Sequence, residues 1–362
     1  MKILFLESFF GGSHRDFALG LKENSSHEID IVSLPARNWK WRMVGAALEF
    51  SRQIKNITKY DLIFATGMIN LAEFKAFAHI KSVPVILYFH ETQITYPLSS
   101  WQKIDLQLAY INIISAIMAK KVFFNSKFQL DEFFIKIDKL LAIIPDLKPE
   151  WIKDEIFKKT SFLYPGCRFP KTLPILDKLN TEKPLIIWNH RWEWDKNPDE
   201  FFWALKLIKQ KKIPFELALL GEQPDTLPDI FIKAKHQFSD EIISYGYIES
   251  KQEYISLLKK GAIVVSTAIQ ENFGVSVIEA VRMGCIPLLP NRLSYPEIMP
   301  KEYLNEILYS GKKDFVTKLE NLLLNYQEYN GLREQLSSSM EKYSWEALIK
   351  NFDMEFEKFI GI

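Results

Sequence analysis

Apolar runs that suit buried strands alternate with stretches of helical periodicity through the first half of the chain. The runs are short, and the stretches between them repeat apolar residues every three or four positions. The predicted strands are Lys2–Glu7, Ile29–Ser33, Leu62–Ala65, Pro84–His90 and Val122–Asn125. The predicted helices lie near His14–Lys22, Val44–Lys55, Leu71–Ala78, Lys103–Ala119 and Lys127–Lys139. This order predicts a parallel sheet with helices on both faces.

A second block of the same kind follows a break in the pattern. Residues 165–184 hold prolines and polar residues without periodicity, which predicts a linker. Beyond it the predicted strands are Leu185–Asn189, Glu216–Gly221, Ile242–Tyr245, Ala262–Thr267 and Cys285–Leu289. The predicted helices lie near Pro198–Gln210, Asp229–His236, Lys251–Lys260 and Val275–Met283. An amphipathic helix is predicted from Ser344 to Phe359.

The two blocks predict an α/β protein of two Rossmann-like, doubly wound domains in series. The expected boundaries are 1–170 for the first domain, 171–343 for the second and 344–362 for the C-terminal helix. Ligands of doubly wound sheets bind at the carboxyl ends of the strands, so we expect a deep cleft between the domains to hold the site.

Composition narrows the class of protein. A chain of 362 residues is too long for one ordinary core, and 48% hydrophobic with 25% charged residues is typical of a soluble globular protein. No apolar stretch has transmembrane length, and Glu7 comes too early for a signal peptide. The two cysteines lie far apart, which predicts buried or free thiols in a reducing compartment and therefore a cytoplasmic protein.

The net charge of +1 hides a difference between the halves. Residues 1–175 carry 23 basic and 17 acidic residues, a formal +6, whereas the remainder carries 23 basic and 28 acidic residues, a formal −5. A basic first half favours a large anionic partner there. Chance unevenness between the halves is the alternative.

The most informative run is residues 271–279, Glu-Asn-Phe-Gly-Val-Ser-Val-Ile-Glu, between a predicted strand and a predicted helix. A helix that begins near Gly274 leans the Glu279 side chain back towards its own N-terminus. Free backbone N–H groups there suit phosphates, and the carboxylates of Glu271 and Glu279 suit hydroxyls. A nucleotide-sugar has both groups. Two solvated glutamates are the alternative.

Other polar residues also stand at predicted strand ends. Gly11 and Gly12 would let backbone approach a ligand closely, although a plain tight turn is the alternative. Arg191 and Lys196 flank a turn, where two cations would stabilise a diphosphate leaving group. His90 is well placed to touch a ligand. A solvated loop and a structural histidine are the corresponding alternatives.

Basic and aromatic residues interleave between Pro35 and Arg42. Such a patch pairs with phosphates and stacks on bases, although its tryptophans could instead pack inwards. None of the six histidines stands at a metal-ligand spacing with a cysteine or another histidine, so no metal site is predicted.

In this order, the motifs resemble those of the GT-B glycosyltransferases of retaining family 4, and the resemblance spans the chain. More narrowly, the chain resembles the tRNA-queuosine mannosyltransferases. The runs that carry the narrower resemblance are Glu7–His14, Leu34–Arg42, Tyr88–Pro97, Ile144–Asp146, His190–Lys196 and Tyr295–Ile298. It implies transfer of mannose from GDP-mannose to the cyclopentene-diol of queuosine at the tRNA wobble position.

The resemblance also implies roles for single residues: Arg191 and Lys196 hold the donor diphosphate, Glu279 the ribose, and Glu271 and His90 the hexose. The residues implied for catalysis or donor binding are Gly11, Gly12, His90, Arg191, Lys196, Glu271, Asn272, Phe273, Gly274, Val275 and Glu279. Those expected at the acceptor are His14, Arg37, Trp39, Lys40, Trp41, Arg42, Glu91 and Gln93. The resemblance implies front-face attack in which the leaving phosphate takes the acceptor proton, so it implies no protein base. GT-B enzymes usually need no bound metal, so it implies no metal cofactor either.

Two other functions remain open from the residues. One is a nucleotide-sugar glycosyltransferase with a lipid or small-molecule acceptor, and the other is a non-catalytic module that binds nucleotide-sugar or RNA. Loss of Arg191, Lys196 or Glu271 would favour the non-catalytic module, and all three are present. The residues do not predict an oligomeric state.

Overall fold

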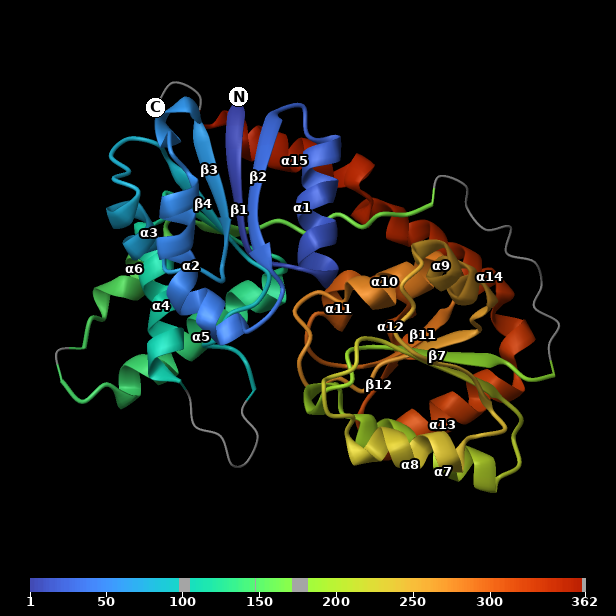
Figure 1. The fold of residues 1–362 in the computed structure, drawn as a ribbon. Coiled ribbons are helices and arrows are strands. Elements are labelled where there is room, and N and C mark those ends of the chain that lie inside the picture. Colours follow the sequence, from blue (N-terminus) through green and yellow to red (C-terminus); the bar gives the residue numbers. More distant parts are fainter. Residues whose placement is uncertain (98–104, 147, 171–181, 360–362) are drawn as a thin grey trace. The chain divides into compact units, whose positions relative to one another are not determined.

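The computed structural model describes residues 1–97, 105–146, 148–170 and 182–359 (Figure 1). Contacts within the chain form two compact units. Unit 1 comprises Met1–Arg168 and Tyr343–Ile362, and unit 2 comprises Phe169–Lys342. Each unit contains a parallel sheet of six strands, so the C-terminal helix packs with the first sheet although it follows the second in sequence.

Unit 1 has the strand order β2-β1-β3-β4-β5-β6. The strands are β1 (Lys2–Phe10), β2 (Glu28–Pro35), β3 (Leu62–Thr66), β4 (Val85–Phe89), β5 (Lys121–Phe124) and β6 (Thr160–Phe162). The helices are α1 (Gly12–Asn24), α2 (Trp39–Gln53), α3 (Leu71–Phe77), α4 (Leu106–Met118), α5 (Lys127–Ile143), α6 (Trp151–Phe157) and α15 (Trp345–Glu357).

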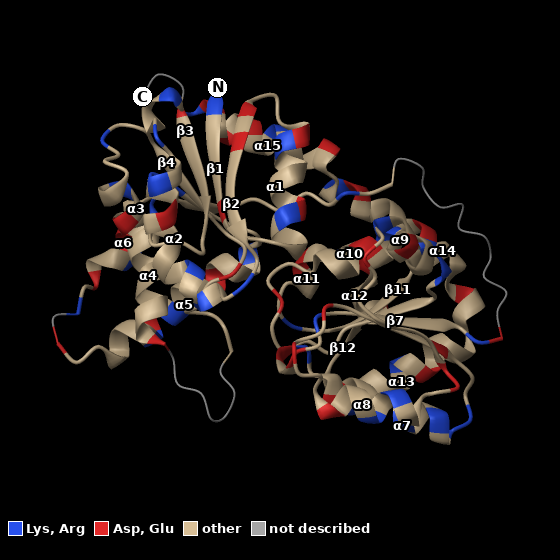
Figure 2. Cartoon of the chain, viewed as in Figure 1, with Lys and Arg blue, Asp and Glu red and all other residues tan. Residues whose placement is uncertain are grey.

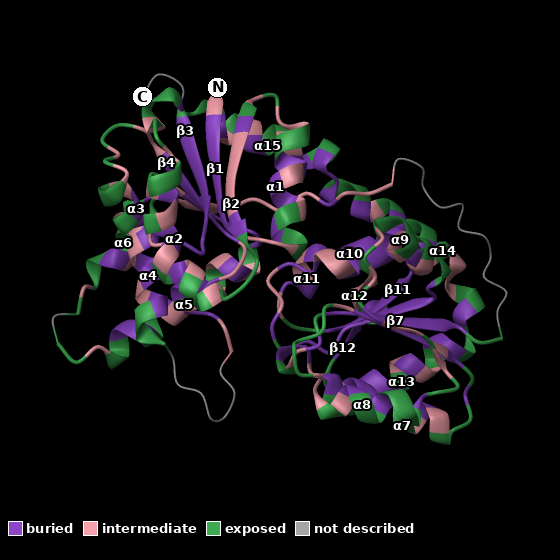
Figure 3. Cartoon of the chain, in the orientation of Figure 1, coloured by how far each residue is buried: buried purple, intermediate pink, exposed green. Residues whose placement is uncertain are grey.

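Strand β1 shows why this sheet is covered on both faces. Ile3 and Phe5 pack with residues of α1 and α15, whereas Leu4 and Leu6 pack with residues of α2 to α6. All four side chains are buried, and the strands of both sheets are largely purple in Figure 3. Charged residues lie mostly on helices and loops, and the strands in Figure 2 are mostly tan. The continuous apolar runs of the sequence are therefore buried parallel strands.

Unit 2 has the strand order β12-β11-β10-β7-β8-β9. The strands are β7 (Leu185–Asn189), β8 (Glu216–Leu220), β9 (Ile242–Gly246), β10 (Ile263–Val265), β11 (Ile286–Pro290) and β12 (Leu308–Tyr309). The longer helices are α7 (Pro198–Gln210), α8 (Asp229–Gln237), α9 (Lys251–Lys260), α10 (Val275–Arg282), α13 (Gly311–Leu324) and α14 (Asn330–Ser339). Two short helices, α11 (Tyr295–Ile298) and α12 (Leu304–Ile307), follow β11.

Local sequence explains several helix starts. The side chains of Asn70, Asp105, Ser126, Ser250 and Ser344 each accept a hydrogen bond from the backbone N–H three residues further on. Such N-caps satisfy one of the donors that a helix leaves free at its start. Pro198 opens α7, where its missing N–H is no loss.

The strand orders also locate the sites. In unit 1 the chain turns back across the sheet between β1 and β3, and in unit 2 between β7 and β10. The carboxyl ends of two such neighbouring strands leave a crevice between their loops, and ligands of doubly wound sheets bind there.

Two predictions about the elements were wrong in part. The short strands β6 and β12 were missed, and so were α6 and the helices from α11 to α14. Helix α2 begins at Trp39 and not near Val44, so most of the basic and aromatic run forms the first turn of a helix. Of the predicted linker at 165–184, residues 171–181 lie outside the described residues, and Cys167 pairs with Ser344 in an isolated parallel bridge.

Candidate functional site

In unit 2, Lys196 and Glu271 meet at the carboxyl ends of β7 and β10. The Lys196 Nζ lies 3.5 Å from the Glu271 Oε2 and 3.4 Å from the Asp195 Oδ2, and it donates a 2.6 Å hydrogen bond to the Gln270 carbonyl. Only 8% of the Lys196 side chain is exposed. A buried ammonium held by two carboxylates and a carbonyl is fixed in position, which suits it to stabilise negative charge that develops in a reaction.

Hydrogen bonds tie the surrounding loops together. The Thr267 Oγ1 donates to the carbonyls of Lys196 and Asn197, at 2.9 Å each. Arg292, which follows β11, donates from Nε to the Ala268 carbonyl at 3.0 Å and from Nη2 to the Thr267 carbonyl at 3.1 Å. Three strand-end loops therefore form one connected network around Lys196.

Arg191 is placed differently from Lys196. It is about half exposed, at 47%, and its Nη1 lies 3.3 Å from the Glu193 Oε1. Burial raises the pKa of Glu193, while neighbouring Arg191 opposes that rise. The two cations predicted to act together therefore differ in burial: Lys196 lies inside the network, and Arg191 lies at its surface.

His190 adds no charge to this loop. Burial, and then the positive charge of Lys196, lower the pKa of His190 from 6.5 to about 3. The imidazole is neutral at physiological pH, so Lys196 and Arg191 are the cations of the loop at residues 190–197.

The residue before helix α10 adopts a backbone conformation that favours glycine. Gly274 has φ 96°, in the left-handed region, and the Ser294 Oγ donates a 3.0 Å hydrogen bond to the Phe273 carbonyl beside it. Asn189, at the end of β7, donates a 2.8 Å hydrogen bond to the Ser276 carbonyl in the first turn. The strand end and the helix start are thus held together, with the first N–H groups of α10 beside the loop.

Glu279 is turned towards the neighbouring helix. It is 7% exposed; its Oε1 lies 2.5 Å from the Lys251 Nζ, and its Oε2 accepts a 3.2 Å hydrogen bond from the Tyr254 Oη. Both partners belong to α9. The sequence predicted that Glu279 leans towards the start of its own helix, and it did not predict these two contacts with α9.

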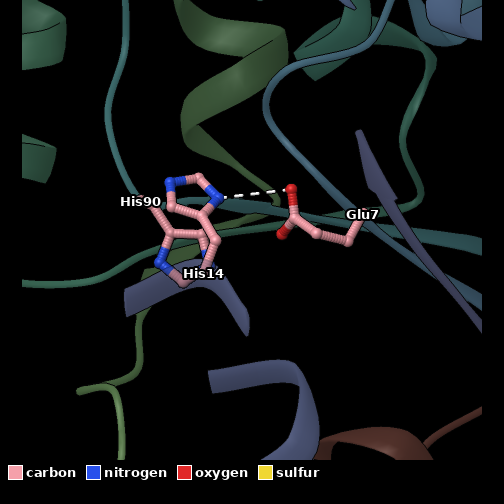
Figure 4. A group of neighbouring side chains, drawn as sticks. All are labelled: Glu7, His14 and His90. Carbon is pink, nitrogen blue, oxygen red and sulfur yellow. Dashed lines mark ion pairs between the residues drawn. The ribbon is translucent and has the colours of Figure 1, made fainter. Parts of the chain in front are cut away.

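In unit 1, the structure brings Glu7, His14 and His90 together (Figure 4). The His14 Nδ1 lies 3.2 Å from the Glu7 Oε1, and the rings of His14 and His90 lie 4.3 Å apart between centroids. One nitrogen from each ring and one Glu7 oxygen all lie within 4.8 Å of one another. Two imidazoles and a carboxylate can hold a metal ion, and they can equally bind hydroxyls.

Sequence spacing did not point to this group, because its members come from three segments. Glu7 lies in β1, His14 in α1, and His90 directly after β4. Burial, and then His14, lower the pKa of His90 well below 6.5, so His90 is neutral at physiological pH.

The two glycines between these segments have different reasons to be there. A Cβ on Gly11 would lie 2.4 Å from the Ala36 Cβ, so this position must remain glycine for β1 and β2 to pack. Gly12 has φ +49°, and a Cβ added there would meet no atom within 4 Å. The contact with Ala36 is one reason for glycine at position 11, and the approach of this turn to a ligand stays a prediction.

The basic and aromatic run lies around the start of α2. Trp41 is 64% exposed, and its ring lies over Gly45 on the same helix. Trp39 is half-buried and packs against the cluster of Met43, Met68, Leu108 and Ile111. One tryptophan therefore packs inwards and the other is on the surface.

The charged residues of this run are accessible. Arg37 and Lys40 are exposed, and the Lys40 Nζ lies 5.5 Å from the centroid of the Trp39 ring. The Arg42 Nε donates a 3.1 Å hydrogen bond to the Pro35 carbonyl.

The loop after β4 is partly buried at Glu91 and Gln93, and the Gln93 N–H donates to the Asn112 Oδ1 at 2.7 Å.

Sequence reasoning missed four residues that shape these sites: Glu7, Lys251, Tyr254 and Arg292. Glu7 carried one usable signal, because an acidic residue at the end of an otherwise apolar strand is expensive to bury without a partner. Lys251 and Tyr254 carried none, since α9 reads as an ordinary surface helix. Both cysteines are buried and neither forms a disulfide, as predicted.

Comparison with known proteins defines the family. Residues 2–167 match the family model of the tRNA-queuosine alpha-mannosyltransferase N-terminal domain, and residues 176–342 match that of glycosyl transferases group 1. A Drosophila melanogaster protein named tRNA-queuosine alpha-mannosyltransferase is 32% identical over 372 residues, which cover 99% of this chain and 97% of that protein. This chain belongs to the tRNA-queuosine alpha-mannosyltransferase family. It is a glycosyltransferase, as the sequence predicted.

Solved structures show the same fold. Sucrose-phosphate synthase from Thermosynechococcus elongatus superimposes with a TM-score of 0.76 at 13% identity, covering 99% of both chains. The lipopolysaccharide outer core galactosyltransferase WaaB gives 0.64 at 15% identity, covering 99% of this chain and 100% of the other. HepE of Anabaena, in complex with UDP, gives 0.69 at 14% identity with the same coverage. The predicted GT-B fold is confirmed. Within the described ranges, every helix is too short or too polar to span a bilayer.

Proposed function

We propose that this chain transfers mannose from GDP-mannose to the cyclopentene-diol of queuosine in tRNA. The observation that carries the proposal is the 32% identity to the Drosophila relative, because it extends over nearly the full length of both chains. The match of residues 2–167 to the N-terminal model of that family supports the tRNA acceptor, since the glycosyltransferase model of residues 176–342 is common to many acceptors.

The donor diphosphate is proposed to bind at the carboxyl ends of β7 and β10. Lys196 is fixed there, Arg191 stands exposed beside it, and the first N–H groups of α10 lie next to both loops. Cations and free N–H groups suit a diphosphate. The UDP complex of the Anabaena neighbour supports a nucleoside diphosphate as the ligand of such a fold.

The hydroxyls of the donor are proposed to bind carboxylates and an imidazole. Glu279 would accept hydrogen bonds from the ribose, in exchange for part of its contact with Lys251. Glu271 would face the hexose together with the backbone of Asn272, Phe273, Gly274 and Val275. The neutral His90 would bind a hexose hydroxyl, since one of its ring nitrogens can donate while the other accepts.

Transfer with retention is proposed to need no protein base. The acceptor oxygen bonds to the anomeric carbon on the face from which the diphosphate leaves, and the bond from that carbon to the phosphate oxygen breaks. The acceptor proton passes to the departing phosphate. Lys196 would stabilise the negative charge as it develops, because it is already in place and needs no reorganisation.

No metal is proposed to take part, since Lys196 and Arg191 can neutralise the diphosphate themselves. Transfer is expected to continue in excess EDTA. Loss of transfer in EDTA with recovery on addition of Mg²⁺ or Mn²⁺ would contradict this part of the proposal.

The tRNA is proposed to bind unit 1 through Arg37, Lys40 and Trp41, which are exposed at the start of α2. Arg42, Trp39, His14, Glu91 and Gln93 complete the proposed acceptor set. The same proposal locates the enzyme in the cytoplasm, where two buried thiols outside any disulfide stay reduced.

A panel of nucleotide-sugars tests the donor. The enzyme is incubated with queuosine-containing tRNA and each donor in turn, the tRNA is digested, and the nucleosides are weighed by mass spectrometry. The expected result is a hexose added to queuosine with GDP-mannose and little with UDP-sugars. Preference for a UDP-sugar would overturn the assignment of the donor.

A further inference from the structure

His90 is held in an aromatic enclosure. The centroid of its ring lies 4.7 Å from that of Phe17, 4.9 Å from Tyr88 and 4.3 Å from His14. Its backbone is held as well, because the Asn125 Nδ2 donates a 2.8 Å hydrogen bond to the His90 carbonyl. Of these three rings, only that of His14 can also form an ion pair. Because the His14 ring packs against the His90 ring, a group that fixes His14 also limits how His90 can turn.

His14 is in turn held by Glu7. Its Nδ1 lies 3.2 Å from the Glu7 Oε1 (Figure 4), and that oxygen also accepts a 2.9 Å hydrogen bond from the Phe9 N–H. Glu7 is fully buried within β1, three residues before its end at Phe10. Its second oxygen, Oε2, is buried and has no hydrogen-bond partner among the residues that the structure describes.

A carboxylate in this position is costly to the fold. A buried acid destabilises a protein unless it is paired. An apolar side chain, like those that fill most of β1, would avoid this cost. Anchoring the turn through the Phe9 N–H does not require an acid, because an amide oxygen accepts the same hydrogen bond. The charge of Glu7 therefore has a use beyond the turn, and His14 is the group that it faces.

We propose that Glu7 is a positioning residue for the transfer reaction, which acts through His14 to hold the His90 ring in the orientation that binds a hexose hydroxyl. The chain of contacts runs from the Phe9 backbone through Glu7 and His14 to His90. This inference rests on the proposed function, because that proposal assigns His90 to the hexose. Glu7 itself need touch no substrate.

Conversion of the carboxylate to an amide tests the charge. Glu7→Gln keeps the acceptor for the Phe9 N–H but removes the charge that faces His14. We expect kcat/KM for the nucleotide-sugar to fall about tenfold, the scale for loss of one charged contact. Affinity for free GDP, which has no hexose, is expected to stay within about twofold. Asp30→Asn is the matched control, because Asp30 lies on β2 beside β1 and pairs with Lys2 at 3.6 Å.

A double-mutant cycle tests the route. If Glu7 acts through His14, Glu7→Gln will have little further effect in a His14→Ala background. Equal effects of Glu7→Gln in both backgrounds would overturn the proposal, and so would a loss of GDP affinity as large as the loss of kcat/KM. Thermal unfolding of each variant shows whether it is folded at the assay temperature. The ring resonances of His90, followed by NMR, should shift in Glu7→Gln; if they do not, the proposal fails even for a variant of low activity.

Failure of the proposed function gives a different result. A wild-type enzyme that transfers no hexose to tRNA refutes that function, while the NMR comparison still tests whether Glu7 orients His90. Zn²⁺ titrated into the wild type distinguishes the remaining use of the same donor set. We expect no stoichiometric binding. Tight binding of one Zn²⁺ that Glu7→Gln and His14→Ala both abolish would replace the positioning role by a metal site.

Discussion

Lys196 and Glu271 lie side by side where the chain of unit 2 turns back across its sheet, with 3.5 Å between Nζ and Oε2. They come from loops after β7 and β10, which are neighbours in the sheet although two strands separate them in sequence. The pair places a cation and a carboxylate in direct contact. This arrangement supports the proposed sugar-diphosphate site, because phosphates suit a cation and hydroxyls suit a carboxylate.

Lys196→Ala and Arg191→Ala are expected to lower kcat/KM for transfer. Loss of one preorganised charge at a leaving group costs about 2–4 kcal/mol of transition-state stabilisation. The effect of Lys196 should be the larger, since it is fixed by three contacts and Arg191 is half exposed. Steady-state kinetics measure both. Lys209→Ala, which breaks the partly buried pair with Glu241 on the same unit, is the control. Turnover near wild type in both variants would place the diphosphate elsewhere.

Glu279→Ala and Glu271→Ala are expected to separate nucleotide from sugar. Glu279 is assigned to the ribose, so its loss should weaken binding of free GDP, whereas loss of Glu271 should mostly spare GDP and impair transfer. Isothermal titration calorimetry measures the first effect. Tyr254→Phe is informative beside them, because it removes the 3.2 Å hydrogen bond to Glu279 and leaves the carboxylate in place. Equal losses of GDP affinity in both glutamate variants would refute the division of roles.

Charge reversal at Arg37 and Lys40 is expected to weaken tRNA binding and to flatten its dependence on salt. Each phosphate contact that a protein cation makes adds to the slope of affinity against salt concentration. Titration of fluorescent tRNA at several salt concentrations gives the slope. Lys153→Glu is the control for net charge, because Lys153 on α6 forms an exposed pair with Asp138 on α5. Binding of wild type that does not change with salt would favour a small-molecule acceptor.

His190 is expected to destabilise the fold as the pH falls. The unfolded chain binds a proton at His190 near pH 6.5, whereas the folded chain does so only near pH 3. The unfolded state therefore holds more protons between these values, and the free energy of unfolding should fall by up to about 1.4 kcal/mol per pH unit from this group. Urea unfolding of wild type and His190→Gln at pH 7 and pH 5 measures it. The two stabilities should converge at the lower pH. A constant difference would contradict the buried neutral state, and His236→Gln on the surface of α8 is the control.

Much of the fold followed from the sequence because buried parallel strands leave continuous apolar runs. Leu185–Asn189 and Pro198–Gln210 have the predicted limits, the first as an uninterrupted apolar run and the second between a proline and a polar turn. The start of α2 was missed because the basic residues of Trp39–Arg42 are typical of a loop. In the structure Trp39 packs against the cluster around Met43, so this segment is part of the helix.

The sites followed less completely, because contacts between distant segments leave no spacing in the sequence. Lys196 and Glu271 were each predicted from a strand end, but their contact depends on the strand order. Glu7 was passed over as part of a strand, and its partner His14 was read only as an acceptor contact. The ion pair of Glu279 with Lys251 and its hydrogen bond from Tyr254 could not be predicted, since both partners lie on a helix without any motif.

One measurement tests the central claim most directly. The enzyme is incubated with GDP-mannose and two matched tRNA samples, one that carries queuosine at the wobble position and one that carries the unmodified guanosine. The account predicts that mass spectrometry finds one added hexose on queuosine and none on any nucleoside of the unmodified tRNA, and that Lys196→Ala loses most of this product. No hexose on queuosine from an enzyme that binds GDP-mannose, or equal transfer to a lipid or small-molecule acceptor without tRNA, would contradict it.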